Sequence, residues 1–558
     1  MQVKVRKDVI KSDVLIIGGG IAGLQAAIAA AEKGAKVIIT EKADTRRSGS
    51  GSTGNDHFMC YIPEYHGNDF NEIILECSET LVGPIQDFDL FRLMMERSFE
   101  LVQKWESYGI SMRPTGKWSF MGHAMPGRRR YHLKYDGHDQ KPCLTKEALR
   151  QGAKIMNKTP ICELLKNDEG RIVGAIGINI ADEEPEVVVF QAKSVILGTG
   201  DSPRLYPGPN PAYPFNTAFC PASSGSGQAM ALRAGARLVN LDLPYNHAGP
   251  KYFARCGKAT WIGVLSDIKG KPIGPFVSQP TRELGDVMAD IWPGVFKEKM
   301  DDGTGPVYMN CSGTSDDDLD YMMKAFASEG DTSLVDYFDQ YNLDLHKDMF
   351  EFTTYEYTLT ARGPDIGLDS STTVPGLYAA GNMTGNVRGD ITSAAVFGQI
   401  SGESASEYAK TVGDYDVSNH PLVTEKIELC NKVLGREVGA HWKEANSMLQ
   451  QIMNDYVGMK VRSESLMKAG LSYVRDLKRY AHEQLMAENA HELMRALEVF
   501  DLIEVGEAVA ICSENRKETR GTHKRTDFTY TNPLLNNKFQ TIELTKDGFK
   551  TEFRNKKR

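Results

Sequence analysis

The segment Gly18-Gly19-Gly20-Ile21-Ala22-Gly23 constrains the fold of this chain more than any other part of the sequence. It follows a short apolar run, Asp13 to Ile17, and opens an Ala-rich stretch, Ile21 to Lys33, after which a second apolar run spans Val37 to Thr40. Strand, glycine turn, helix and strand in this order form the opening unit of a dinucleotide-binding fold. The sequence therefore predicts an N-terminal α/β domain whose first helix begins beside the phosphates of a dinucleotide.

Glu41 supports this prediction, because it follows Gly23 by 18 residues and stands at the end of the second expected strand. A carboxylate at that point accepts hydrogen bonds from ribose hydroxyls. A glycine-rich turn without a ligand is the alternative. It is disfavoured because the strand, the helix and the acidic residue are all in register. The motif alone does not distinguish FAD from NAD.

Two later segments favour FAD. Ala192 to Gly200 and Gly376 to Asn382 each read as a buried strand that ends in a turn of small residues. In flavoproteins with two dinucleotide folds, such turns approach the flavin from opposite sides. The helix that opens near Ser393 and Ala394 is expected to direct free backbone N–H groups at the flavin O2 edge, where they stabilise the negative charge of reduced flavin.

The length of 558 residues exceeds what one hydrophobic core supports, so several domains are expected. Residues 145 to 200 are read as alternating helix and strand, and about 420 to 515 as amphipathic helices. The last 40 residues are polar and basic. The predicted domains are an FAD-binding domain over 1–240 and 366–412, an inserted capping domain over 241–365, and a C-terminal helical domain with a basic tail over 413–558.

Composition excludes several classes of protein. The net charge of -9 argues against a nucleic-acid binder. No apolar run approaches the roughly 20 residues of a membrane span, and the N-terminus lacks the pattern of an export signal, so a cytoplasmic protein is expected. The nine cysteines are scattered and never spaced C-x-x-C, which supports neither a disulfide framework nor a zinc or iron-sulfur site.

Three further motifs carry a resemblance to a known family. They are Gly225 to Ala236, Val396 to Glu403, and Arg516-Lys517-Glu518-Thr519-Arg520-Gly521-Thr522-His523-Lys524-Arg525-Thr526-Asp527. Together with the opening motif, they resemble the flavoprotein subunits of fumarate reductase and succinate dehydrogenase, L-aspartate oxidase and the adenylylsulfate reductase alpha subunit. The loop from Tyr131 to Pro142 and the inserted segment are most similar in layout to the last of these.

The resemblance implies an α/β fold: a Rossmann-like FAD-binding domain, an inserted α+β capping domain and a C-terminal helical domain. Members with covalent flavin carry a His where this chain has Gly49, so noncovalent FAD is expected. The residues expected to bind the cofactor are Gly18, Gly20, Ile21, Ala22, Gly23, Glu41, Lys42, Arg47, Ser48, Gly49, Thr53, Gly54, Asn55, Thr199, Gly200, Asp201, Gly381, Asn382, Thr392, Ser393 and Ala394.

The substrate side is less well matched. The resemblance implies that His247 binds substrate and that Arg282, in Thr281-Arg282-Glu283, is the catalytic acid or base, which a guanidinium can be only when it is desolvated. A His and a shared arginine segment that anchor dicarboxylates in the family are missing. Arg362 and Arg388 remain as candidates for binding an anion. For each of these residues, a packing or solvated role is the alternative.

These features predict an FAD-dependent oxidoreductase that exchanges electrons between a small anionic substrate and a ferredoxin-like iron-sulfur partner subunit, because the cofactor supplies the redox chemistry and the protein supplies orientation and charge. Two alternatives remain. One is an adenylylsulfate-reductase-like alpha subunit that acts through a sulfite adduct of the flavin. The other is a flavoprotein that only relays electrons within a larger complex.

Overall fold

The structure is a computed structural model that describes residues 1–52, 55–80, 85–120, 129–208, 214–217, 219–251, 253, 261–273, 279–281, 295–329, 331–458 and 461–557. Its main sheet has the order β6 (Lys154–Met156), β3 (Val37–Thr40), β2 (Ile10–Ile17), β9 (Glu186–Leu197), β8 (Ile172–Asn179), β7 (Ile161–Lys166). β1 (Lys4–Val5) and β16 (Leu377–Ala379) also pair with β9. The pairs from β6 to β9 are parallel, while β8 and β7 extend the sheet in antiparallel fashion.

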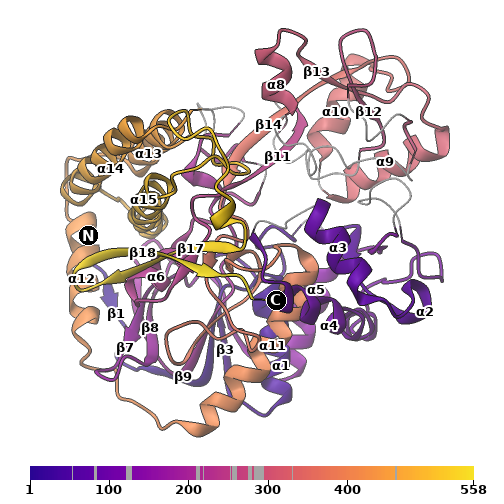
Figure 1. The fold of residues 1–558 in the computed structure, drawn as a ribbon. Coiled ribbons are helices and arrows are strands. Elements are labelled where there is room, and N and C mark those ends of the chain that lie inside the picture. Colours follow the sequence, from indigo (N-terminus) through magenta and orange to yellow (C-terminus); the bar gives the residue numbers. More distant parts are fainter. Residues whose placement is uncertain are drawn as a thin grey trace.

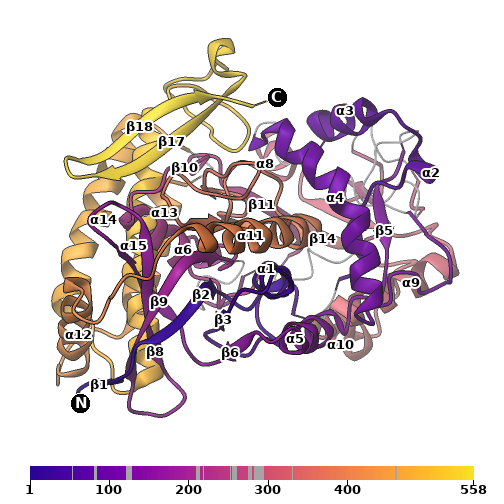
Figure 2. The same cartoon turned by 90° about the horizontal axis from the view of Figure 1, so that it is seen from below.

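The predicted opening unit is confirmed. β2, α1 (Ile21–Glu32) and β3 follow one another as expected, and the later strands β9 and β16 run side by side in parallel. β3 is buried along its length, which explains its run of Val and Ile rather than an alternating pattern. α1 packs along α11 (Ile391–Thr411), which returns from 370 residues later in the chain (Figure 2).

The expected alternation of helix and strand over residues 145–200 was wrong. α5 (Gln140–Arg150) is followed by four strands, β6 to β9, without an intervening helix. β7, β8 and β9 form an antiparallel meander, whose short connections leave no room for crossover helices. Their apolar residues face the core of the main domain, so the apolar spacing alone did not separate strand from helix.

The inserted segment forms a body of its own, which Figure 1 shows beside the main domain. Its sheet has the order β11 (Tyr245–Pro250), β14 (Phe350–Thr358), β13 (Val307–Asn310), β12 (Val264–Ser266), and α8 (Val295–Asp301), α9 (Asp316–Glu329) and α10 (Thr332–Tyr341) accompany it. A separate apolar cluster around Trp261, Phe326 and Phe352 fills it. A smaller ribbon, β4 (His57–Met59) paired with β5 (His132–Lys134), belongs to the main domain, as do α2 (Pro63–His66), α3 (Phe70–Thr80), α4 (Phe88–Ser107) and α6 (Ser226–Arg233).

The C-terminal part contains the four helices α12 (Pro421–Leu434), α13 (Trp442–Tyr456), α14 (Glu464–Gln484) and α15 (Ala490–Asn515), as the helical pattern predicted. The tail differs from the expectation of a basic extension. β17 (Lys538–Thr545) and β18 (Gly548–Asn555) form a hairpin that joins β10 (Leu238–Val239) and β15 (Gly363–Pro364) in a second sheet (Figure 1). The tail therefore ties the two ends of the inserted segment to the main body.

Candidate flavin and substrate site

A cavity of about 490 Å³ extends from the glycine turn of the main domain to the inserted body. Its walls come from the turn before α1, the segment after β3, the ends of β9 and β16, the N-terminal end of α11 and residues of α15. Trp261, Met309 and Phe352 of the inserted body line its far end. The cavity thus lies at the carboxyl ends of the parallel strands and continues to the junction with the insert, where ligands of such sheets bind.

The glycine turn is built for close approach of backbone. Gly18 has φ +100°, and a Cβ at this position would lie 2.5 Å from the carbonyl oxygen of Gly198. A Cβ at Gly23 would lie 1.8 Å from the carbonyl oxygen of Gly18. α1 begins at Ile21 directly after this turn and has no side-chain cap, so its first N–H groups are left for a phosphate.

Glu41 is buried at the end of β3 and lines the cavity. Its carboxylate accepts hydrogen bonds from the backbone N–H of Gly19 at 2.7 Å and of Ala43 at 2.8 Å. These bonds fix the side chain across the glycine turn. Each carboxylate oxygen retains a further lone pair, so the geometry fits an acid that also accepts ribose hydroxyls.

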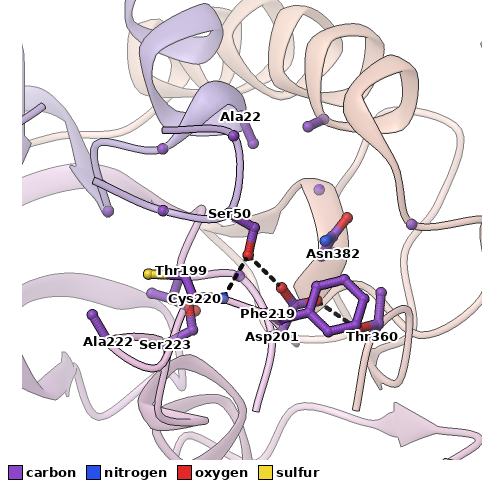
Figure 3. Close-up of a pocket in the computed structure, with 18 of the residues that line it drawn as sticks. Ala22, Ser50, Thr199, Asp201, Phe219, Cys220, Ala222, Ser223, Thr360 and Asn382 are labelled. Atoms are coloured by element: carbon purple, nitrogen blue, oxygen red, sulfur yellow. Dashed lines mark hydrogen bonds between the residues drawn. The ribbon is translucent and has the colours of Figure 1, made fainter. Parts of the chain in front are cut away.

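Polar side chains from separate segments of the chain are joined by hydrogen bonds inside the cavity (Figure 3). Ser50 donates to Asp201 at 3.1 Å, and Thr360 donates to the other carboxylate oxygen at 2.7 Å. The Ser50 hydroxyl also accepts the backbone N–H of Cys220 at 3.3 Å. Asp201 is buried, so these bonds hold a carboxylate in place inside the cavity.

The N-terminal end of α11 differs from the expectation. The N–H of Ser393 donates to the side chain of Asp390 at 2.8 Å, and the N–H of Ala394 donates to the Asp390 carbonyl at 3.0 Å. These two groups are therefore not free to bind a flavin, because Asp390 is the N-cap of the helix. The buried hydroxyls of Thr392 and Ser393 have no hydrogen-bond partner among the described residues.

Most of the residues expected to bind the cofactor line this one cavity. They are Gly18, Gly20, Ile21, Ala22, Glu41, Lys42, Arg47, Ser48, Gly49, Asn55, Thr199, Gly200, Asp201, Gly381, Asn382 and Ala394. Gly23, Thr392 and Ser393 lie behind its wall rather than on it. Thr53, Gly54 and Arg282 lie outside the described residues. His247 belongs to β11, but its side chain lies outside them too.

Of the substrate candidates, Arg362 and Arg388 both line the cavity. Arg362 is only 7% exposed, which excludes the solvated-loop alternative. Its Nε donates to the carbonyl of Leu243 and its Nη1 to that of Thr360, and its guanidinium lies 5.9 Å from the ring centre of Tyr245. Burial lowers the pKa of Arg362 to about 10. Arg388 is paired with Asp390.

Sequence reasoning missed the end of the cavity that α15 closes. Met494, Leu497 and Glu498 of this helix line it, although they lie in the C-terminal part of the chain. Glu498 is buried and bonds Lys42 at 2.6 Å and Arg204 at 2.5 Å. These cations outweigh the effect of burial and hold the pKa of Glu498 well below its usual range. No local pattern indicates this contact, because the partners are some 300 to 450 residues apart.

Comparisons with known proteins agree with this arrangement. Residues 13–250 match the model of an FAD binding domain, and residues 446–554 match that of the fumarate reductase flavoprotein C-terminus. The chain is 25% identical to one of the subunits of the fumarate reductase (CoM/CoB) of Methanothermobacter marburgensis, over 95% of this chain and 97% of that protein. It is 24% identical to the alpha subunit of the adenylylsulfate reductase of Megalodesulfovibrio gigas over 53% of this chain and 49% of that one.

Two solved structures share the fold. Adenylylsulfate reductase of Archaeoglobus fulgidus superposes with a TM-score of 0.86 at 22% identity, covering 100% of this chain and 97% of that chain. The quinol fumarate reductase flavoprotein of E. coli superposes with a TM-score of 0.79 at 18% identity, covering 100% and 97%. No helix among the described residues is long and apolar enough to cross a membrane. With its FAD-binding domain, its matching C-terminal domain and a cavity that fits a dinucleotide, the chain is an FAD-dependent oxidoreductase of the family that contains the fumarate reductase, succinate dehydrogenase and adenylylsulfate reductase flavoproteins.

Proposed function

We propose that this flavoprotein exchanges electrons between a small anionic substrate, bound where the cavity meets the inserted body, and an iron-sulfur partner subunit. FAD supplies hydride chemistry there, and the chain supplies orientation and charge. One observation supports the proposal that the substrate is an anion. Arg362 is buried on the cavity wall, and no carboxylate among the described residues lies within ion-pair distance of it.

Burying a guanidinium without a countercharge is costly, which is why buried charges are normally paired. Two N–H groups of Arg362 donate to backbone carbonyls, and the guanidinium lies over the ring of Tyr245. These contacts fix the plane of the guanidinium. A carboxylate, sulfite or phosphate ester in the cavity would supply the missing charge, and Arg388, which also lines the cavity and is paired with Asp390, is a second cation there. Arg362 and Arg388 are therefore the proposed anion anchors. Arg282 as acid or base and His247 as a binding group stay predictions from the resemblance.

The partner is proposed from the electron balance. A flavin that has oxidised or reduced a substrate must then pass electrons to, or accept electrons from, another carrier before the next turnover. The nine cysteines show no C-x-x-C spacing, and no group of three potential metal-ligating side chains is found in the described parts of the chain. Several relatives are named as subunits, among them one from a fumarate reductase and one from an adenylylsulfate reductase. A separate iron-sulfur protein fits both facts.

A second candidate is chemistry on sulfite and a nucleotide. It is favoured by the fold shared with adenosine-5-phosphosulfate reductase, whose solved structure holds a covalent sulfite adduct, with a TM-score of 0.86 at 22% identity. A sulfite or sulfate group fits Arg362 and Arg388 as well as a carboxylate does. The relay alternative is disfavoured, because a relay has no use for an unpaired buried cation in a capped cavity.

The test uses the holoprotein with its flavin photoreduced under anaerobic conditions. Reoxidation by fumarate, crotonate or adenylylsulfate is followed at the flavin absorbance, and sulfite with and without AMP is titrated into the oxidised form. In Arg362→Met we expect the flavin to remain bound while the affinity for the active anion falls about 10- to 100-fold, as for the loss of a charged hydrogen bond of ~1.5–3 kcal/mol. Arg479→Met, on the exposed face of α14, is the control. Wild-type protein that responds to none of these anions, yet exchanges electrons with a co-purified ferredoxin-like protein, would establish the relay instead.

A further inference from the structure

A histidine with a carboxylate behind it stands on the cavity wall outside the residues considered so far. His57 opens β4 and lines the cavity. Its Nδ1 lies 2.6 Å from Oδ1 of Asp56. A carboxylate held this close makes Nδ1 the protonated nitrogen of the neutral ring. The second ring nitrogen, Nε2, points to the opposite side of the imidazole from Asp56.

Asp56 is held in turn from two sides. Its Oδ2 accepts from Lys134 Nζ at 2.8 Å and from the Tyr321 hydroxyl at 3.1 Å. Lys134 is the cross-strand partner of His57 in the β4–β5 ribbon, so both side chains rise from the same face. His132, on the same strand, places its ring 5.5 Å from that of His57, edge to face. Among the described residues, Asp56, Lys134, His132 and Tyr321 are thus polar groups that lie near this imidazole.

The electrostatics keep Asp56 ionised. Burial raises the pKa of this carboxyl, but the charge of Lys134 and the hydrogen bond from His57 outweigh burial and hold the pKa well below its usual range. Asp56 in turn raises the pKa of Lys134 against the effect of burial. Burial raises the pKa of Tyr321 to about 12, so its hydroxyl is a neutral donor at physiological pH. A fixed anion behind an imidazole orients the ring.

We propose that His57, rather than Arg282, is the proton donor and acceptor for the substrate of the proposed reaction, and that Asp56 and Tyr321 are its positioning residues. During reduction of an enoate such as fumarate, the N–H bond at Nε2 of the imidazolium breaks, the carbon–carbon π bond breaks, and the proton forms a bond to the carbon next to the one that receives hydride. FAD, when bound, would supply the hydride and its two electrons. The imidazole is left neutral and takes its next proton from water. In the oxidative direction the same proton moves back to Nε2.

Tyr321 links the His57–Asp56 pair to the inserted body. It lies on α9, 265 residues after Asp56, and reaches across from the insert to the ribbon of the main domain. Lys134 Nζ also lies 5.6 Å from the Tyr321 ring centre, so the phenol contacts both members of the ion pair. The hydrogen bond to Asp56 forms only while α9 is seated against the main domain. Seating of the insert therefore adds a hydrogen bond to the carboxylate that orients His57.

The proposal rests on the proposed function, and its test separates the two. Holoproteins with His57→Gln, Asp56→Asn, Tyr321→Phe and Arg282→Ala are photoreduced and mixed with whichever of fumarate and crotonate reoxidises wild type faster. His138→Gln is the matched control, because His138 is also paired with a carboxylate, at 2.7 Å, but its side chain is 60% exposed on the surface. Affinity for the same anion is measured separately, from its perturbation of the oxidised flavin spectrum.

We expect His57→Gln to bind the anion within threefold of wild type while single-turnover reoxidation slows at least ~100-fold, the usual contribution of general acid catalysis. Asp56→Asn should slow it about tenfold, Tyr321→Phe less, and His138→Gln not at all. Reoxidation of wild type by none of the anions would remove the proposed function. Rapid reoxidation of wild type together with a His57→Gln rate within threefold of it would remove only the role of His57, and so would a loss of rate matched by a loss of affinity. A loss of rate in Arg282→Ala at unchanged affinity, with His57→Gln as fast as wild type, would assign the proton transfer to Arg282 instead.

A second readout needs no turnover. With ¹⁵N-labelled histidine, the resonances of His57 are assigned by their absence in His57→Gln. Neutral His57 should carry its proton on Nδ1 in the wild-type protein and lose this preference in Asp56→Asn, because the amide no longer attracts that proton as a carboxylate does. A wild-type His57 protonated on Nε2 would contradict the proposed geometry.

Discussion

Lys141 offers the sharpest test of how charge is arranged around the glycine turn. It lies on α5, is 1% exposed, and donates from Nζ to the carbonyl of Gly19, inside the turn that precedes α1. No carboxylate among the described residues lies within ion-pair distance of this ammonium. Burial accordingly lowers the pKa of Lys141 from 10.5 to about 8, and Glu41 and Asp44 only partly offset this effect. The site therefore holds a cation beside the place where we expect a diphosphate.

The lowered pKa of Lys141 gives the free energy by which its burial destabilises the folded apoprotein. A decrease from 10.5 to about 8 corresponds to ~3 kcal/mol by which the folded apoprotein disfavours the charged lysine. Because the folded pKa is the lower one, this cost is full below pH 8 and disappears as the pH rises towards 10.5. Lys141→Met keeps the length of the side chain, removes this cost and loses a hydrogen bond of ~1 kcal/mol. The apoprotein should therefore gain ~2 kcal/mol at pH 7.

Although Lys141→Met should stabilise the apoprotein, it should weaken the binding of FAD. If the ammonium contributes ~1.4 kcal/mol to the binding of the diphosphate, its loss weakens FAD about tenfold. Flavin-free protein is prepared for both forms, unfolded with heat and denaturant between pH 7 and 10.5, and titrated with FAD at pH 7. Lys146→Met, exposed on the same helix, is the control and should change neither quantity. A Lys141→Met apoprotein that is less stable than wild type at pH 7, with unchanged FAD affinity, would refute the reasoning and leave Lys141 a packing residue.

Three further predictions follow from the same structure. Because Gly49, which lines the cavity, has no side chain that could bond a flavin covalently, acid precipitation should leave the yellow flavin in the supernatant and a colourless pellet; a yellow pellet would contradict this. Gly23→Ala should abolish FAD retention, measured as flavin per chain after gel filtration, because its Cβ would lie 1.8 Å from the Gly18 carbonyl oxygen. Glu498→Gln should lower the free energy of unfolding by ~3–5 kcal/mol, since it leaves Lys42, Arg204 and Arg495 without their shared carboxylate, whereas the exposed Glu483→Gln should change it by less than ~0.5 kcal/mol.

The sequence predicted those parts of the fold that are local in the chain. The unit from β2 to β3, the strands β9 and β16 and the C-terminal helices each carry their own periodicity or turn residues, so their positions follow from short windows. The hairpin of β17 and β18 was missed as part of a sheet because its partner β10 lies about 300 residues earlier, at the start of the inserted segment. Alternating residues such as Phe539 and Thr541 indicate a strand, but they carry no information about which strand it joins.

The site shows the same limit. Glu41 and the glycine turn are found together because they act within one βαβ unit. Arg362 was recognised as a possible anion ligand, yet its burial could not be read from Ala361-Arg362-Gly363-Pro364, a segment that looks like an exposed turn. The link from Asp56 to Tyr321 exists only once the insert is folded against the main domain, so no spacing in the sequence indicates it.

Lys141 and Arg362 together suggest why an acidic chain keeps two poorly compensated cations in its interior. Both are buried: Lys141 donates to the glycine turn, and Arg362 lines the cavity. Each lacks a carboxylate partner in the described part of the chain. Such groups destabilise the free protein unless an anion joins them. A dinucleotide diphosphate and an anionic substrate would relieve the two costs at separate places, and each would then stabilise the folded chain through its own binding free energy. The electrostatic cost in the protein without ligands is thus the counterpart of selectivity for two anions, one bound at the glycine turn and one bound at Arg362.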